Sequence, residues 1–250
     1  MTLYLWLNVL IILFPLLLSF DRRVAFYRSW PSVLPAIAVV GILYIAWDVY
    51  MSANGHWGFN PRYSGRVRIL HLPLGELLFF LTAPYSCLFI YEVVRAYFKE
   101  AHVRVPRALW LAVAGALATA AVVFRSQVYT FSVLLSVALF LSLAALLRRD
   151  ILGSRHFWLF MALSYIPFLL FNGLLTGIPI VVYSSEAIWG ARLYTIPVED
   201  TLYSFSLLGF GALVHRMIAD RRGGGRRKSG HRSTQRRPGG RVISGEGADG

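Results

Sequence analysis

Two short segments of this chain place carboxylates just after a proline, and they match each other 124 residues apart. The first segment is Pro73 to Glu76, and the second is Pro197 to Asp200, which also includes Glu199. Each segment opens a long apolar run, so we expect its acids at the start of a membrane helix. Ionisable side chains are costly to keep in a membrane and are functional-site candidates by default. The two segments therefore predict a duplicated carboxylate site.

Other polar residues repeat at the same spacing. Asp48 lies 25 residues before the proline of the first segment, and Asn172 lies 25 residues before the proline of the second. Arg68 and Arg192 also occupy equivalent positions. Because arginine pairs with carboxylates through charge-assisted hydrogen bonds, these two arginines are candidate partners of the motif acids.

Aromatic side chains accompany the acids on the expected helix faces. Tyr203 follows the two acids of the second segment at i+3 and i+4, and Glu76 neighbours Phe79 and Phe80 in the same way. Apolar surroundings favour the neutral form of a carboxyl group, which can then donate a proton, and ring faces stabilise a developing cation. The alternative is that the acids only complement the helix dipole and the rings only pack.

The composition is that of an integral membrane protein. The chain is 57% hydrophobic and 15% charged, with a mean hydropathy of +0.58, whereas soluble domains carry about 25% charged residues. Seven apolar runs are each close to the ~20 residues that cross a bilayer. These runs are 3–20, 33–50, 74–91, 108–124, 129–147, 157–175 and 201–218.

The distribution of basic residues predicts the orientation of these spans. Twenty of the 25 Lys and Arg residues fall on the side that includes the C-terminus. Basic residues concentrate in cytoplasmic loops, so we expect a multi-pass protein of the cell membrane with a cytoplasmic C-terminus and an external N-terminus. The first run lacks a basic leader and a cleavage site, which indicates an uncleaved span. The loops before both motifs then face outward.

The repeat spacing predicts the domain organisation of an all-α membrane protein with seven transmembrane helices. We expect two parallel three-helix repeats joined by a linker helix, because a fourth span restores the orientation of the second copy. Two equivalent sites would then open on the same side. The predicted units are 1–98 (first repeat), 99–126 (linker with helix 4), 127–218 (second repeat) and 219–250 (a disordered basic tail).

The sequence lacks the residue patterns that several other kinds of chemistry require. The chain has six His and a single Cys, and neither residue type shows the spacing of a metal site. No phosphate-binding glycine loop and no dinucleotide fingerprint is present. The two lysines, Lys99 and Lys228, lie outside the predicted spans, so no retinal Schiff base can form there. We therefore expect no metal and no cofactor, and no nucleic-acid partner.

The motifs together resemble the small membrane lycopene cyclases, in particular the heterodimeric-type bacterial and fungal group, here with both halves fused. The family pattern has two glutamates in the first segment, and this chain departs from it with Gly75 at the first of them. The resemblance rests on Trp47-Asp48, 55–61 (GHWGFNP), 72–80 (LPLGELLFF) and Tyr91-Glu92 in the first half, and on 172–176 (NGLLT), 179–183 (PIVVY), Arg192, 195–200 (TIPVED) and Tyr203 in the second.

The resemblance implies a lycopene β-cyclase, an isomerase of the intramolecular-lyase type. Such an enzyme protonates a linear ψ-end of the carotenoid, closes a six-membered ring and releases a proton, without a cofactor. The catalytic candidates are Glu199, Asp200 and Glu76. The candidate substrate-binding residues are Tyr203, Phe79, Phe80, Asp48, Asn172, Trp57 and Tyr183.

A second hypothesis is a non-enzymatic membrane carotenoid binder or transporter, since repeats with intramembrane acids also occur in transporters. In either case the partners are lycopene or a related linear carotenoid and the lipid bilayer, with other enzymes of carotenoid synthesis as further candidates. The sequence leaves open whether one or both ends are cyclised and whether the ring is β, γ or ε.

Overall fold

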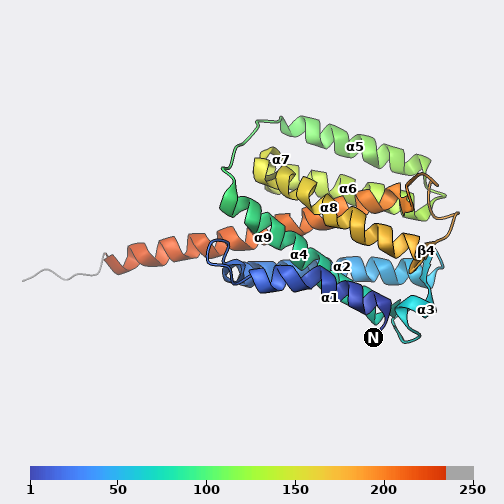
Figure 1. The fold of residues 1–250 in the computed structure, drawn as a ribbon. Coiled ribbons are helices and arrows are strands. Elements are labelled where there is room, and N and C mark those ends of the chain that lie inside the picture. The colour runs from blue at the N-terminus through green and yellow to red at the C-terminus, as the bar shows by residue number, and fades with distance from the viewer. Residues whose placement is uncertain (235–250) are drawn as a thin grey trace, which may run out of the picture.

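The computed structural model describes residues 1–234, with residue 149 and residues 223–234 described by their backbone only. The protein is all-helical, as predicted, with short strands in the loops (Figure 1). The long helices are α1 (Leu3–Leu18), α2 (Trp30–Ala53), α4 (Leu74–Tyr97), α5 (Arg107–Val123), α6 (Val128–Leu147), α8 (Arg155–Gly177) and α9 (Val198–Thr234). The short elements are η1 (Phe26–Ser29), α3 (Pro61–Ser64), α7 (Arg149–Gly153), β1 (Trp57–Phe59), β2 (Arg68–Ile69), β3 (Leu72–Pro73), β4 (Val181–Tyr183), β5 (Arg192–Leu193) and β6 (Ile196–Pro197).

The seven predicted runs correspond to the seven long helices. Five of them, α2, α4, α6, α8 and α9, are long and apolar enough to cross a membrane. The other two, α1 and α5, are apolar but shorter, with 16 and 17 residues. The chain is thus a multi-pass membrane protein. Helix α9 continues past 218, where the last predicted run ends, as far as Thr234. The rest of the predicted tail, 235–250, lies outside the described residues.

Helices α4 and α9 form the centre of the bundle. Helix α4 packs against α1, α2, α8 and α9, and α9 packs against α2, α4, α6 and α8. Helix α5 lies along α6 at one side of the bundle, with α1 and α2 at the other (Figure 1). Prolines start both central helices. Pro73 is the N-cap of α4 and Pro197 directly precedes α9, so the motif acids lie in the first turns, as predicted.

Two equivalent hairpins lead into α4 and α9. In the first, β2 pairs with β3 through Arg68 opposite Pro73. In the second, β5 pairs with β6 through Arg192 opposite Pro197. Each residue of the second hairpin lies 124 positions after its counterpart in the first, so the repeated sequence forms the same local structure twice.

A third strand pair joins the two halves of the chain. Strand β1 runs antiparallel to β4, with Trp57 opposite Tyr183 and Gly58 opposite Val182. Gly58 and Val182 are themselves 124 positions apart, so this pairing is symmetric about its centre. The strand pair thereby brings the two repeated loops together at the end of the bundle where α4 and α9 begin.

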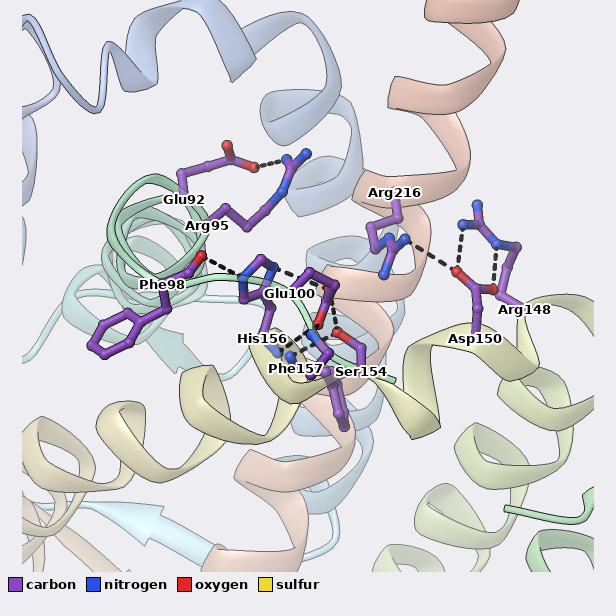
Figure 2. A network of polar contacts seen from close by, with 11 residues as sticks. Glu92, Arg95, Phe98, Glu100, Arg148, Asp150, Ser154, His156, Phe157 and Arg216 are labelled. Carbon is purple, nitrogen blue, oxygen red and sulfur yellow. Dashed lines mark hydrogen bonds and ion pairs between the residues drawn. The ribbon is translucent and has the colours of Figure 1, made fainter. Parts of the chain in front are cut away.

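A polar network ties the helices together at the opposite end (Figure 2). Glu100, in the loop after α4, accepts a hydrogen bond from the Ser154 hydroxyl at 2.8 Å and contacts His156 Nδ1 at 3.0 Å. Burial alone would raise the pKa of Glu100, but the hydrogen bonds from Ser154 and the His156 backbone N–H lower it below its ordinary value. Nearby, Asp150 pairs with Arg148 at 3.0 Å and with Arg216 of α9 at 3.1 Å.

Candidate functional site

A cavity of about 580 Å³ lies between α1, α4, α8 and α9, with its polar groups gathered at the end where α4 and α9 begin. Asp48 and Glu76 from the first half and Asp200 from the second all line it. The remaining lining is largely apolar. Instead of the two separate sites that the repeat predicts, carboxylates of both halves share this cavity, because α4 and α9 pack directly against each other.

Glu76 and Asp48 form a pair of buried carboxyl groups. Glu76 lies in the first turn of α4, where the Tyr4 hydroxyl of α1 donates a hydrogen bond to its Oε2. Asp48, on α2, is 2% exposed and accepts a hydrogen bond of 2.6 Å from Trp57 Nε1. Both carboxyl groups line the same cavity, and Asp48 Oδ2 has no hydrogen-bond partner among the described residues. Two buried carboxyl groups in one largely apolar cavity do not both ionise cheaply, which favours a proton on one of them.

Asp200 has a different environment from this pair. Its Oδ1 accepts a hydrogen bond from the Tyr129 hydroxyl at 2.7 Å, and its Oδ2 accepts from Asn172 Nδ2 at 2.8 Å and from the Tyr183 hydroxyl at 3.0 Å. Hydrogen bonds donated to a carboxylate favour its charged form. Tyr183 lies in β4, and burial together with the neighbouring Asp200 charge raises its pKa well above the ordinary value, so it remains a donor. Among the carboxyl groups that line the cavity, Asp200 thus receives the most hydrogen bonds.

The two halves use matched positions for these different roles. The Tyr4–Glu76 hydrogen bond has its counterpart in the Tyr129–Asp200 hydrogen bond. The position of Asp48 is occupied in the second half by Asn172, 124 residues later. An amide can donate a hydrogen bond to its neighbour but cannot supply a catalytic proton. The first half therefore places a carboxyl group where the second half places an amide.

Glu199 lies outside the cavity, unlike the other catalytic candidates. It is fully buried, and its Oε1 accepts hydrogen bonds from Thr130 Oγ1 at 2.6 Å and from the Trp189 backbone N–H at 2.7 Å. Its Oε2 has no hydrogen-bond partner among the described residues. These contacts connect the start of α9 to α6 and to the preceding loop, so Glu199 holds the elements that position Asp200.

Gly75 occupies the equivalent position in the first half, and the Tyr4 ring explains why. A Cβ atom at residue 75 would lie 2.7 Å from the Tyr4 ring, and the Asn8 side-chain amide donates to the Gly75 carbonyl at 2.9 Å. Real side chains do not approach this closely. The departure from the family pattern therefore makes room for the tyrosine that contacts Glu76.

All of the predicted substrate-binding residues line the cavity. The aromatic members surround the carboxylates, where their ring faces can stabilise a cation. Sequence reasoning missed Tyr4 and Tyr129, although both stand near the start of an apolar run at almost the repeat spacing. These cavity-lining residues are Tyr203, Phe79, Phe80, Asp48, Asn172, Trp57 and Tyr183.

The expected pairing of Arg68 and Arg192 with the motif acids is wrong. Arg68 donates to the carbonyls of Gly65 at 2.7 Å and Phe59 at 3.0 Å. Arg192 donates to the Thr195 carbonyl at 2.7 Å. Both guanidinium groups therefore stabilise the loops that carry them, where backbone carbonyls would otherwise lack partners.

Comparison with known proteins identifies a family for this chain. The family model described as lycopene cyclase matches residues 1–94 and 126–218. The first segment runs from α1 into α4 and the second from α6 into α9, and the unmatched stretch between them contains α5. No curated protein and no solved structure matches the chain significantly. Because the family match covers most of its length and both carboxylate motifs, this chain belongs to the lycopene cyclase family.

Proposed function

We propose that the protein is a lycopene β-cyclase that converts linear ψ-ends of the carotenoid into β-rings by an acid-initiated isomerisation. Membership of the lycopene cyclase family supports a linear carotenoid substrate. The observation that carries the proposal is the Asp48–Glu76 pair facing Asp200 at the polar end of an apolar cavity. An apolar polyene gains nothing from buried carboxyl groups unless they take part in its chemistry, so this observation favours an enzyme over a carotenoid binder.

The Asp48–Glu76 pair supplies the proton. The proton adds to the terminal double bond of the ψ-end, and a tertiary carbocation results. The neighbouring double bond attacks this carbon, closes a six-membered ring and moves the positive charge to a ring carbon. Ring faces of Trp57, Phe79 and Tyr203 line the cavity and stabilise the charge through cation–π interaction.

Asp200 accepts the final proton. As the carboxylate held by three donors, it is the base that removes a proton from the ring carbon beside the cation. The two electrons of that C–H bond then form the ring double bond. One proton enters and one leaves, so the product has the mass of the substrate and the reaction is redox-neutral. Glu199 acts through Asp200 as a positioning residue.

The proposed topology has seven spans. Helices α1 and α5 cross the membrane with the five longer helices, in two parallel three-helix repeats (1–98 and 127–218) joined by a linker (99–126). The matched hairpins and the symmetric β1–β4 pair support this arrangement. The basic residues favour an external N-terminus and a cytoplasmic C-terminus in the cell membrane, which places the carboxylates near the outer surface.

Expression in lycopene-accumulating bacteria tests the proposal. We expect the red pigment to turn yellow-orange, with cyclised products of unchanged mass and β-rings identified by chromatography against standards. Lycopene that remains uncyclised, although the protein is present in the membrane, would refute the enzyme and favour the carotenoid binder.

A further inference from the structure

We propose that the uncyclised arm of the carotenoid lies along α4 inside the cavity, and that Cys87 and Ile90 at its inner end determine which substrate lengths are accepted. The inference rests on the proposed function, because it takes the carotenoid as the substrate. It goes further by assigning a role in substrate selection to the part of the cavity that lies away from the carboxylates.

The cavity has the shape of a narrow channel. Its lining side chains on α4 extend from Glu76 to Ile90, and those on α1 from Tyr4 to Pro15. At 1.5 Å per residue these stretches measure about 21 Å and about 16 Å. A volume of about 580 Å³ spread over such a length leaves room for one extended chain across its width. The carboxylates lie at one end, so a polyene whose ψ-end reaches them extends toward the other.

The inner part of the channel suits hydrocarbon. Its walls include Ile11 and Phe14 of α1 and Pro167 and Phe168 of α8. Ser86 is a polar residue in this part of the lining, and its hydroxyl is already bonded to the Ile11 carbonyl at 2.9 Å and to the Thr82 carbonyl at 2.8 Å. The channel therefore presents apolar surface to an apolar arm.

The channel also opens toward lipid. Leu10 and Phe14 of α1 and Leu170 of α8 line the cavity and are also 51%, 66% and 60% exposed. Exposed apolar side chains on membrane helices face the bilayer, so the gap between α1 and α8 connects the channel to the acyl chains in which a carotenoid dissolves. The substrate enters sideways through this gap.

The equivalent channel in the second half is filled. Tyr44 and Trp47 on α2 stand 124 residues before Phe168 and Phe171, and they occupy the corresponding space. The Tyr44 hydroxyl bonds to Ser206 Oγ at 2.7 Å and to Ser136 Oγ at 3.0 Å, which fastens α2 to α9 and α6. The rings of Tyr44 and Trp47 are 5.4 Å apart. Aromatic side chains therefore fill in one half of the chain the space that remains an open channel in the other.

Substitutions at the inner end test the inference with two linear carotenoids, lycopene and one shorter by two isoprene units. Cys87→Trp and Ile90→Trp shorten the channel, so we expect lycopene conversion to fall by about tenfold or more, while conversion of the shorter substrate stays near the wild-type rate. Equal loss with both substrates, or no loss with either, would overturn the inference. Failure of the wild-type protein to convert lycopene would instead refute the proposed function.

Leu13→Trp is the matched control, because Leu13 lies beside Phe14 on α1 but outside the channel lining, where it is exposed. It should change both conversions by less than about twofold, as surface substitutions usually do. Ile90→Ala tests the inference in the opposite direction, without overpacking. It deepens the channel and should raise the conversion of a linear carotenoid longer than lycopene relative to lycopene itself. An unchanged ratio would contradict the proposed role of Ile90.

Discussion

At the scale of single residues, the site depends on one difference between two matched positions. Asp48 and Asn172 stand at equivalent places beside the equivalent acids Glu76 and Asp200. A carboxyl group beside a carboxylate can hold and release a proton, whereas an amide beside a carboxylate can only donate a hydrogen bond. In the proposed mechanism, this single exchange distinguishes the acid of the first half from the base of the second.

Replacement of Asp48 by asparagine should therefore remove the acid while preserving the packing. The new amide can donate to Glu76 as Asn172 donates to Asp200. We expect the cyclisation rate in isolated membranes to fall by about 10²–10⁴, the usual cost of losing a general acid. The protein level should stay at that of the wild type. An Asp48→Asn protein with nearly full activity would place the proton donor elsewhere.

Glu199 and Asp200 should respond differently to amide substitution, although they are neighbours. Asp200→Asn loses the base and should lower the rate by about 10²–10⁴. In Glu199→Gln the side-chain oxygen can still accept from Thr130 and Trp189, so we expect a loss below about tenfold. Initial rates at matched protein levels provide the comparison. A larger loss in Glu199→Gln than in Asp200→Asn would reverse the assigned roles.

At the scale of the elements, the positions of the helices could be predicted from the sequence, whereas the shared cavity could not. Each predicted apolar run coincides with a long helix, because hydrophobic length directly sets where a span lies, although α9 continues past its run to Thr234. The first-turn placement of Glu76 and Asp200 followed from the prolines before them. The β1–β4 pairing, the Tyr4–Glu76 contact and the burial of Glu199 away from the cavity depend on how α1, α4, α6 and α9 pack, which periodicity does not encode.

The contact between α1 and α4 predicts a strict requirement for glycine at residue 75. Gly75→Ala places a Cβ 2.7 Å from the Tyr4 ring, and overpacking of this kind typically costs about 1–3 kcal/mol. We expect a lower thermal unfolding temperature in detergent. Gly115→Ala in α5 is the control, since no atom lies within 4 Å of the new Cβ. Equal stability of the two variants would mean that α1 does not approach α4 this closely.

The loop that follows α4 predicts a pH-dependent contribution to stability. Because the folded-state pKa of Glu100 is lowered, its hydrogen bonds stabilise the fold above the pKa of the unfolded chain and are lost as the pH falls through the folded value. Glu100→Gln should therefore lower the unfolding temperature at neutral pH, and the difference from wild type should disappear in acid. Glu186→Gln, at an exposed loop position, should show no such trend. A difference that grows in acid would contradict the assignment.

At the scale of the whole molecule, the acids of the two halves meet in one cavity, which we propose as a single catalytic centre. The duplicated motifs predict two sites, but α4 and α9 meet at the middle of the bundle and their acids line the same cavity. The aromatic filling around Tyr44 then leaves the channel beside α1 and α8 to receive the substrate. A carotenoid with two linear ends must accordingly present them to this centre one after the other, through release and re-entry.

The most direct test is the product profile of three proteins in lycopene-accumulating cells: the wild type, Asp48→Asn from the first half and Asp200→Asn from the second. Chromatography and mass analysis at matched membrane levels separate uncyclised, monocyclic and dicyclic carotenoids. The shared centre predicts cyclised products for the wild type and almost entirely unaltered lycopene for both variants, because each variant lowers the rate by about 10²–10⁴. Monocyclic carotenoid formed by either variant at a rate near that of the wild type would show that each half works on its own, and would contradict a single centre built from both.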